Sequence, residues 1–559
     1  MNQNFMQRRC LAIIGFLIFF LMTVPGAFAH NGCGTAQFIQ AIRQQRQTGS
    51  QPSARQAAST TNASSCTAED LYDSVYSRTT SHFQIFYTLQ GPHKTTQAYI
   101  DTLANALETA WNFHVSKTGM LPPKGDTLSY HYQKHVQSGL YPVEVIEITL
   151  VRSNGYNGAI YCNACFGATL PSSSGKDFST LIIDNDFLYP PTTNSSYDTV
   201  FVNEKKCAYR VSSLALYNKV HSYSYAQNWV QGLRVTSAHE LYHAIQFRYV
   251  DLLSYWTFWF EASATGAEEI VHPDVDDYIQ YLTNTAMAVG VTLEQLEESQ
   301  SYGTSTLFLY NYNYVAHNAD KTIWESLAKK PGESFQYHYS QLAAKQGHSA
   351  DSLFHDYAIK LSLSGNQTKL VDTALWLNND QNLWPEYQTV PTQKMNSQST
   401  FPELSYKFYT NGKPDLSDFK GKASVAIIKE NSYEIRHLST QNSVESTYTD
   451  IQNMSGVDST IWILSRLSED QSLPYIVKDS TLLAYPTPWR HGALCFTPLP
   501  EDKEYIEIRN RRGNLVSKEA YSNNTLCLEE SRVKELMVPR VYRFRAGNRG
   551  KLKDFIIVY

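Results

Sequence analysis

The sequence predicts an α+β domain followed by an all-β, sandwich-like C-terminal domain, and three observations support this fold class. Segments with strand character recur between residues 82 and 184. Longer segments with helical periodicity follow, between residues 235 and 363. Beyond about residue 385, short apolar runs alternate with polar turns. Strands followed by helices are typical of an α+β domain, and 559 residues are too many for one compact core.

The N-terminal 29 residues are typical of a secretory signal peptide. Two consecutive arginines precede an apolar run, and an A-x-A cleavage site ends at Ala29. We expect the mature protein to begin at His30 and to be secreted or periplasmic. No later stretch reaches the roughly 20 apolar residues of a membrane span. Residues 30–76 are rich in Gln, Ser, Thr and Ala, which predicts a flexible N-terminal segment.

The first domain is expected at residues 77–386, from strand segments and amphipathic helices. Alternating apolar and polar residues predict strands, and apolar residues every three or four positions predict helices. The expected strands are 82–87, 143–151 and 180–184. The expected helices are 96–118, 235–249, a run that carries residues 261–268, 307–327 and 334–363.

The second domain is expected at residues 387–559. Its apolar runs are separated by polar turns, including Gly-Asn pairs that begin at residues 513 and 547. The expected strands are 423–428, 461–464, 475–477, 505–508, 541–544 and 555–559. The pattern favours an all-β sandwich, and it leaves open whether this domain binds a ligand or supports the first domain.

The motif His239-Glu240-x-x-His243 is the most informative feature of the chain. Residues four apart lie on one face of a helix, so both imidazoles can point at one ion. Glu240 lies about 100° around the helix, beside such an ion rather than on it. Glu261, on the next expected helix, offers a carboxylate as the third ligand. Two His and one Glu hold Zn²⁺ with an open fourth position, which is the catalytic arrangement.

The ligand set resembles the gluzincin group of zinc metallopeptidases, in which H-E-x-x-H is followed by a Glu ligand on the next helix. An acidic residue often follows seven positions later, as Glu268 follows Glu261 here. Metzincins would require Gly and His at the positions of Gln246 and Tyr249, so that group is excluded. The stretch around Glu261 also resembles the aminopeptidase branch. The Gly-Ala-Met-Glu-Asn motif of that branch is missing, so an endopeptidase is preferred.

Three flanking stretches make roughly residues 78–365 similar to uncharacterised secreted bacterial metalloproteases. These stretches are Ser81–Tyr87, Ile182–Phe187, and Tyr302-Gly303 with Ile323–Glu325. The resemblance implies a thermolysin-like zincin catalytic domain, a small sheet plus a helical half, at residues 77–386. It also implies a protein or peptide substrate, with the strand of Asp184 near the substrate cleft.

The resemblance further implies roles for individual residues. One catalytic Zn²⁺ activates a water, and Glu240 moves the water's proton to the leaving amine. Glu268 accepts the N–H of a ligand imidazole and fixes its orientation. A further donor is expected at the developing oxyanion. Tyr302 is the first choice for this donor, and Tyr310 and His317 are the alternatives.

Seven cysteines remain after signal removal, so at least one is free or pairs between chains. The expected bridges are Cys495–Cys527, Cys33–Cys66 and one within the set Cys162, Cys165 and Cys207. A second interpretation of the N-terminal segment is a prosegment in which Cys33 or Cys66 caps the metal.

Other interpretations stay open. A secreted zinc-fold binding or adhesion protein would not need the base that Glu240 provides. A zinc hydrolase of a non-peptide amide or a glycan-linked substrate would carry the same motif. Asp184 and Asp186 suggest Ca²⁺, but two acidic residues alone do not support a site. His272 is expected to be a loop histidine. A net charge of -5 without a basic tract argues against nucleic acid as a partner.

Overall fold

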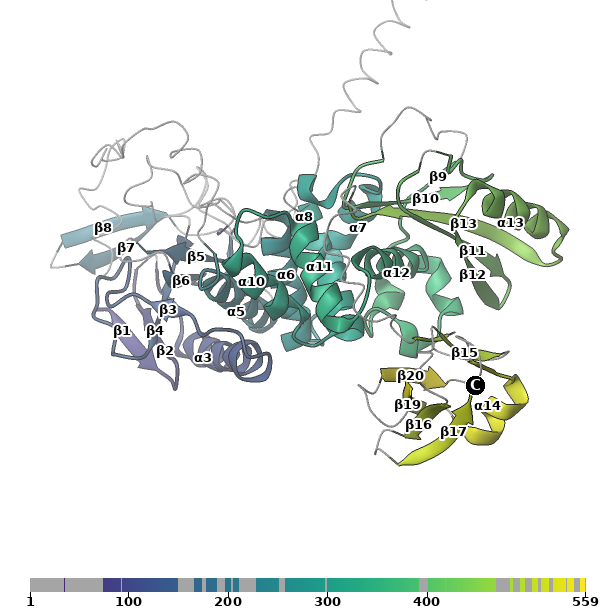
Figure 1. The fold of residues 1–559 in the computed structure, drawn as a ribbon. Coiled ribbons are helices and arrows are strands. Elements are labelled where there is room, and N and C mark those ends of the chain that lie inside the picture. The colour runs from purple at the N-terminus through teal and green to yellow at the C-terminus, as the bar shows by residue number, and fades with distance from the viewer. Residues whose placement is uncertain are drawn as a thin grey trace, which may run out of the picture. The chain divides into compact units, whose positions relative to one another are not determined.

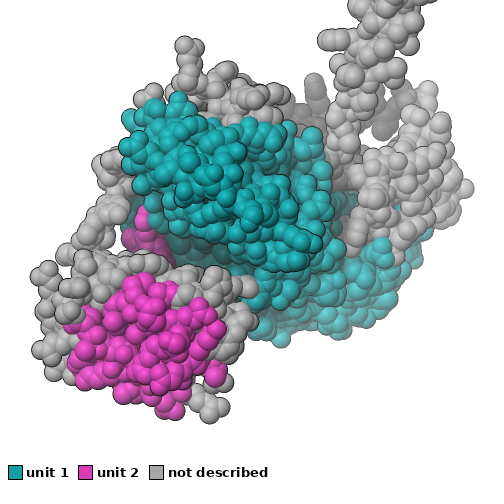
Figure 2. Space-filling model, turned by 90° about the vertical axis from the view of Figure 1, so that its right-hand side faces the viewer, with its two compact units in different colours: residues 1–342, 351–469 teal, residues 343–350, 470–559 magenta. Residues whose placement is uncertain are grey.

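The structure is a computed structural model. It describes residues 35, 74–91, 93–148, 165–172, 177–188, 197–202, 205–210, 228–250, 257–296, 299–391, 401–417, 419–468, 483–485, 493–497, 505–510, 514–521, 526–538, 540–546 and 553–557. The chain divides into two compact units, residues 1–342 with 351–469 and residues 343–350 with 470–559 (Figure 2). Helices and strands together make this a mixed α+β protein, as the sequence predicts.

Six strands of the first unit form one sheet. Five of them follow the order β1-β2-β4-β6-β3, and the sixth, β5, pairs with β6 on the edge that faces away from β4. Their bounds are β1 (Tyr76–Thr79), β2 (Phe83–Tyr87), β3 (Lys124–Gly125), β4 (Tyr141–Ile146), β5 (Gly167–Pro171) and β6 (Phe178–Asp184). Strands β2, β4 and β6 are parallel, whereas β1 and β5 run antiparallel to their neighbours. A separate hairpin joins β7 (Tyr197–Val202) to β8 (Lys205–Arg210).

Helix α3 (Gln97–Trp111) contacts the sheet at β2 and also packs against helix α5 (Figure 1). The Thr96 side chain caps it by accepting a first-turn backbone N–H, which satisfies one otherwise unpaired donor. Ile100 and Leu103 recur on its buried face. The helix continues as a π-helical turn at Asn112–Lys117. Strands β2 and β4 are buried along their whole length, as parallel strands usually are.

Helices make up the second half of this part of the chain. They are α5 (Trp229–Gln246), α6 (Thr257–Val271), α7 (Ile279–Met287), α8 (Ser299–Gly303), α9 (Ser305–Tyr310), α10 (Ala319–Lys329), α11 (Phe335–Gln346) and α12 (Ala350–Ser362). Helix α5 packs on β5 and β6, and α6 packs on α5, α8 and α9. The helix expected at 307–327 is interrupted, because α9 ends in a π-helical turn at Asn311–Val315 before α10 begins.

A second sheet follows in the same unit, in the order β12-β11-β13-β10-β9. Its strands are β9 (Thr389–Pro391), β10 (Ser405–Thr410), β11 (Lys422–Lys429), β12 (Ser432–Leu438) and β13 (Val457–Arg466). Helix α13 (Gln441–Asn453) places Val444 and Ile451 in one core with Val425 and Trp462 of the sheet. The expectation of an all-β region is therefore wrong here. With only a few apolar residues on α13, the sequence pattern did not reveal this helix.

The second unit contains two small sheets, in the orders β14-β15-β18 and β17-β16-β19-β20. Its elements are β14 (Leu483–Tyr485), β15 (Leu494–Thr497), β16 (Tyr505–Asn510), β17 (Leu515–Ala520), β18 (Leu526–Leu528), α14 (Glu530–Leu536), β19 (Arg540–Ala546) and β20 (Lys553–Ile557). The disulfide Cys495–Cys527 joins the paired residues of β15 and β18, which confirms this predicted bridge. Phe496, Ile508 and Phe544 share the core of the unit.

Some sequence predictions fall outside the described residues. These are the signal peptide, the flexible segment apart from Thr35 and residues 74–76, the bridge Cys33–Cys66 and the strand at 475–477. Cys165 is disulfide-bonded, but its partner lies outside the described side chains. The compact units divide near residue 469, whereas the sequence suggested a boundary near 386. Among the described helices, none is long and apolar enough to cross a membrane.

The close packing of α6 on α9 leads to a stability prediction. A Cβ added to Gly266 would lie 2.4 Å from Cδ1 and 2.9 Å from Cβ of Phe308, so a rotation of the ring cannot relieve the clash. We expect Gly266→Ala to lower the free energy of unfolding by about 1–3 kcal/mol. Gly332→Ala is the matched control, because nothing lies within 4 Å of its added Cβ. Equal thermal unfolding curves for the two variants would contradict the packing described here.

Candidate metal centre

Helix α5 presents His239 and His243 on one face, as their four-residue spacing predicts. Their ring centroids lie 4.6 Å apart, with an interplanar angle of 87°. Both side chains are buried, and so is every residue of α5 from 235 to 246. The two imidazoles are therefore held by packing on all sides of the helix rather than exposed to solvent.

Helix α6 brings Glu261 to the same point. Its Oε2 atom lies 3.3 Å from Nε2 of His239 and 3.5 Å from Nε2 of His243. Two ligands that bind Zn²⁺ tetrahedrally, at about 2.0–2.1 Å each, lie about 3.3 Å from one another. Among the described residues, these three form one of two groups whose potential ligand atoms lie within 4.8 Å of one another. The spacing and the donor types fit one Zn²⁺.

Glu261 is buried, with 1% of its surface exposed. Neither of its carboxylate oxygens accepts a hydrogen bond within the described part of the chain. Burial acts to raise the pKa of this carboxyl, but the adjacent His243 and His239 imidazoles outweigh burial and lower the pKa to about 2. A buried carboxylate without hydrogen bonds is costly, and a cation between the three side chains would satisfy it.

The other ring nitrogen of each histidine is held by an oxygen. Nδ1 of His239 lies 2.5 Å from Oε1 of Glu268, and Nδ1 of His243 lies 2.7 Å from Oε1 of Gln246. The Gln246 amide nitrogen donates to Phe260 and Ser263 of α6, so its oxygen must face the imidazole. Each Nδ1 atom therefore faces a hydrogen-bond acceptor, and Nε2, the nitrogen that faces Glu261, is the one left for metal ligation.

Gln246 is a residue that the sequence interpretation missed. It follows His243 by three positions, so the two lie on one helix face, and this spacing was the available signal. The Phe260 ring also stacks on the His243 imidazole, with centroids 4.2 Å apart and an interplanar angle of 7°. Glu268, in contrast, lies at the position that its sequence spacing predicted, next to a ligand imidazole.

Glu240 points toward strand β5. Its Oε2 accepts a hydrogen bond from the Thr35 hydroxyl at 2.9 Å. The Thr169 hydroxyl shares its hydrogen between this oxygen, at 3.0 Å, and the Glu240 backbone carbonyl, at 2.7 Å. Its Oε1 has no hydrogen-bond partner among the described residues. An added Cβ on Gly167 would lie 2.8 Å from Cγ of Glu240, so only glycine allows β5 to approach this closely. One carboxylate oxygen is thus anchored, and the other is available for a proton.

The three candidate oxyanion donors lie in different surroundings. The Tyr302 ring lies 5.9 Å from the His239 ring and stacks on Tyr281. The hydroxyl of Tyr310 donates to Asp356, at 3.0 Å. The His317 ring contacts Tyr312 in a separate pocket. Of the three, only Tyr302 has its ring beside a ligand imidazole.

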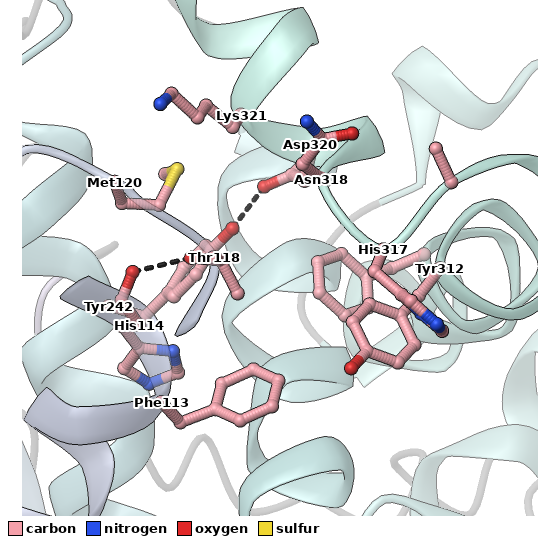
Figure 3. Close-up of a pocket in the computed structure, with 12 residues that line it drawn as sticks. Phe113, His114, Thr118, Met120, Tyr242, Tyr312, His317, Asn318, Asp320 and Lys321 are labelled. Atoms are coloured by element: carbon pink, nitrogen blue, oxygen red, sulfur yellow. Dashed lines mark hydrogen bonds between the residues drawn. The ribbon is translucent and has the colours of Figure 1, made fainter. Parts of the chain in front are cut away.

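That separate pocket lies beside α5 and contains none of the three candidate ligands (Figure 3). It is lined mainly by aromatic and apolar side chains, with Phe113 and His317 on its wall and Tyr242 contributed by α5. The Tyr242 hydroxyl donates to Asp320. We assign the pocket no role in the chemistry, because the metal ligands face elsewhere.

Asp184 and Asp186, considered from the sequence for Ca²⁺, are not part of either group of three closely spaced ligands. Asp184 accepts the backbone N–H of Phe187 at 2.7 Å and that of Ile148 at 3.2 Å. Burial raises the pKa of Asp184, and the nearby Glu147 and Asp186 raise it further. His272 lies just beyond α6, where its Nδ1 accepts a hydrogen bond from Arg234.

Comparisons with known proteins give no further guidance. No family model matches the chain, and no curated protein and no solved structure matches it. The assignment of the centre therefore rests on its geometry and on the chemistry of its side chains.

The His239–Glu268 contact leads to a prediction about metal affinity. We expect Glu268→Gln to weaken Zn²⁺ binding about 10- to 100-fold, because the amide cannot support the imidazole with a negative charge. Competition with a chromophoric chelator measures the affinity. The control is Glu108→Gln, because Glu108 makes the same kind of contact with His82, at 2.7 Å, away from the centre. Equal Zn²⁺ affinity in both variants would contradict this role for Glu268.

Proposed function

We propose that the protein is a secreted zinc-dependent endopeptidase with a thermolysin-like catalytic domain. The observation that carries the proposal is the joint arrangement of His239, His243 and Glu261. Their ligand atoms have the spacing of a tetrahedral Zn²⁺ site, and both histidines are held in the ligating tautomer. Glu240 lies beside this arrangement with one oxygen anchored. Three ligands and an adjacent base are what hydrolysis requires.

The chain's own residues supply the proton chemistry. Zn²⁺ bound here would activate a water for attack and polarise the scissile carbonyl. Glu240 takes the proton of the attacking water on Oε1 and donates it to the leaving amine. Thr35 and Thr169 approach the other oxygen of this carboxylate, and Oε1 is the oxygen without a hydrogen-bond partner among the described residues. Tyr302 donates its phenolic hydrogen to the oxyanion that develops during attack.

An edge strand beside the base favours a peptide substrate. Among the described strands β5 pairs only with β6, so no described strand occupies its other edge. The backbone N–H of Thr169 points to that edge, where it donates to the Thr35 hydroxyl at 2.7 Å. An extended peptide that pairs with an open strand edge gains main-chain hydrogen bonds of this kind. Such a peptide would pass next to Glu240, which bonds Thr169.

The base is tested by Glu240→Gln. We expect the variant to bind one Zn²⁺ as tightly as the wild type and to lose at least about 100-fold in kcat for a peptide library, because the amide cannot accept the proton. Metal analysis and peptide cleavage measure the two properties. Glu325→Gln, on α10, is the control and should cleave normally. Zn²⁺-loaded wild type that cleaves no peptide would contradict the endopeptidase proposal.

The oxyanion donor is tested by Tyr302→Phe. We expect kcat to fall about 100-fold at nearly constant KM, since the hydrogen bond forms only in the transition state. Tyr310→Phe is the matched control. It removes a hydroxyl that donates to Asp356, so it should lower stability by about 1 kcal/mol and leave kcat unchanged. Similar kcat values for the two variants would remove Tyr302 from the mechanism.

A further inference from the structure

A second group of acidic side chains lies at the end of α6, separate from the candidate zinc ligands. Glu269, Asp276 and Asp380 each place one carboxylate oxygen within 4.8 Å of the others. Glu269 belongs to the last turns of α6, Asp276 to the loop before α7, and Asp380 to the segment after α12. Two oxygens on opposite sides of one Ca²⁺ lie about 4.8 Å apart, so the group has the span of a single ion.

The hydrogen-bond donors around this group are too few for its oxygens. Glu269 is buried, with 4% of its surface exposed, and its Oε2 has no hydrogen-bond partner in the described structure. The Asn378 amide nitrogen faces three acceptors, on Glu269, Asp380 and Tyr278. Asp380 also accepts from Tyr278, and Tyr278 accepts from Trp384, so Oε2 of Glu269 is the oxygen that the described donors leave without a hydrogen bond. No described Lys or Arg forms an ion pair with any of the three carboxylates.

We propose that Glu269, Asp276 and Asp380 bind one Ca²⁺. All three ligands are carboxylate oxygens, which suit a hard cation rather than Zn²⁺. The unpartnered Oε2 of Glu269 would gain a ligand bond in place of the hydrogen bond that it lacks. Water and backbone carbonyls complete the six to eight oxygen ligands that Ca²⁺ takes.

The carboxylates of this group are costly to keep charged where they lie. Burial, to which the charges of Asp380 and Asp276 add, raises the pKa of Glu269 to about 8. Burial also raises the pKa of Asp380. A cation among the three carboxylates would offset this cost.

The position of the group suggests a structural consequence. Asp380 accepts the Tyr278 hydroxyl, and the Trp384 indole N–H donates to that same hydroxyl, at 2.7 Å. An ion at this point would tie the segment after α12 to the end of α6. Glu269 directly follows Glu268, which orients a zinc-ligand imidazole. The ion would thus stabilise the part of α6 on which the candidate zinc site depends.

The test is a Ca²⁺ titration of the purified full chain, followed by calorimetry and thermal unfolding. We expect one ion to bind with a dissociation constant of about 10⁻⁵–10⁻³ M and to raise the Tm by about 2–5 °C at saturation. The absence of both binding and a Tm shift at about 10 mM Ca²⁺ would overturn the proposal.

Three variants locate the ion. Glu269→Gln should lose the Ca²⁺ response while melting at the same or a higher temperature than the Ca²⁺-free wild type, because it removes a buried charge. Asp274→Asn is the control, since Asp274 is exposed and pairs with Arg234. Glu261→Gln should lose Zn²⁺ and keep Ca²⁺, which separates the two sites. Wild-type Ca²⁺ binding in Glu269→Gln would place the ion elsewhere and overturn the assignment.

Discussion

The crossing of α5 and α6 is the constraint on which the candidate site depends. Gln246 of α5 accepts from His243 and donates to the Phe260 carbonyl and the Ser263 hydroxyl of α6. The Phe260 ring stacks on the His243 imidazole. Because Glu261 directly follows Phe260, these contacts fix the distance between the two histidines and the third ligand. A shift of either helix would break these buried hydrogen bonds and, at the same time, move Glu261 away from the two histidines.

A second network of buried hydrogen bonds also holds α5 and α6 together. The Tyr242 hydroxyl of α5, the Trp259 indole of α6 and the Trp324 indole of α10 all donate to Asp320. Burial raises the pKa of Asp320 to about 7, although the three hydrogen bonds oppose this shift. Three helices are therefore tied to one carboxyl group. Such a network favours a single relative position of the helices, since any other leaves a buried polar group unsatisfied.

The sequence predicted those parts of the site that lie close together along the chain. The spacing of His239, His243, Glu261 and Glu268 follows helical geometry, and the structure places these four side chains as that geometry requires. The contacts of Glu240 could not be predicted in this way. Thr169 and Thr35 reach it from distant parts of the chain, so only the tertiary fold determines their positions. Likewise, a helix with few apolar positions, α13, gave too weak a pattern to detect.

The burial of helix α5, which carries two of the candidate metal ligands, determines which residues any molecule can contact at the centre. Every position of α5 from 235 to 246 is covered by other elements of the described structure. A substitution on this helix would therefore destabilise the fold before it changed the contacts with a bound molecule. Strand β5 is restricted in the same way, because it is buried from Gly167 to Leu170 and an added Cβ on Gly167 would meet Glu240. Substitutions in the helix or in this short strand would thus change the stability of the fold before they changed what the candidate centre can contact.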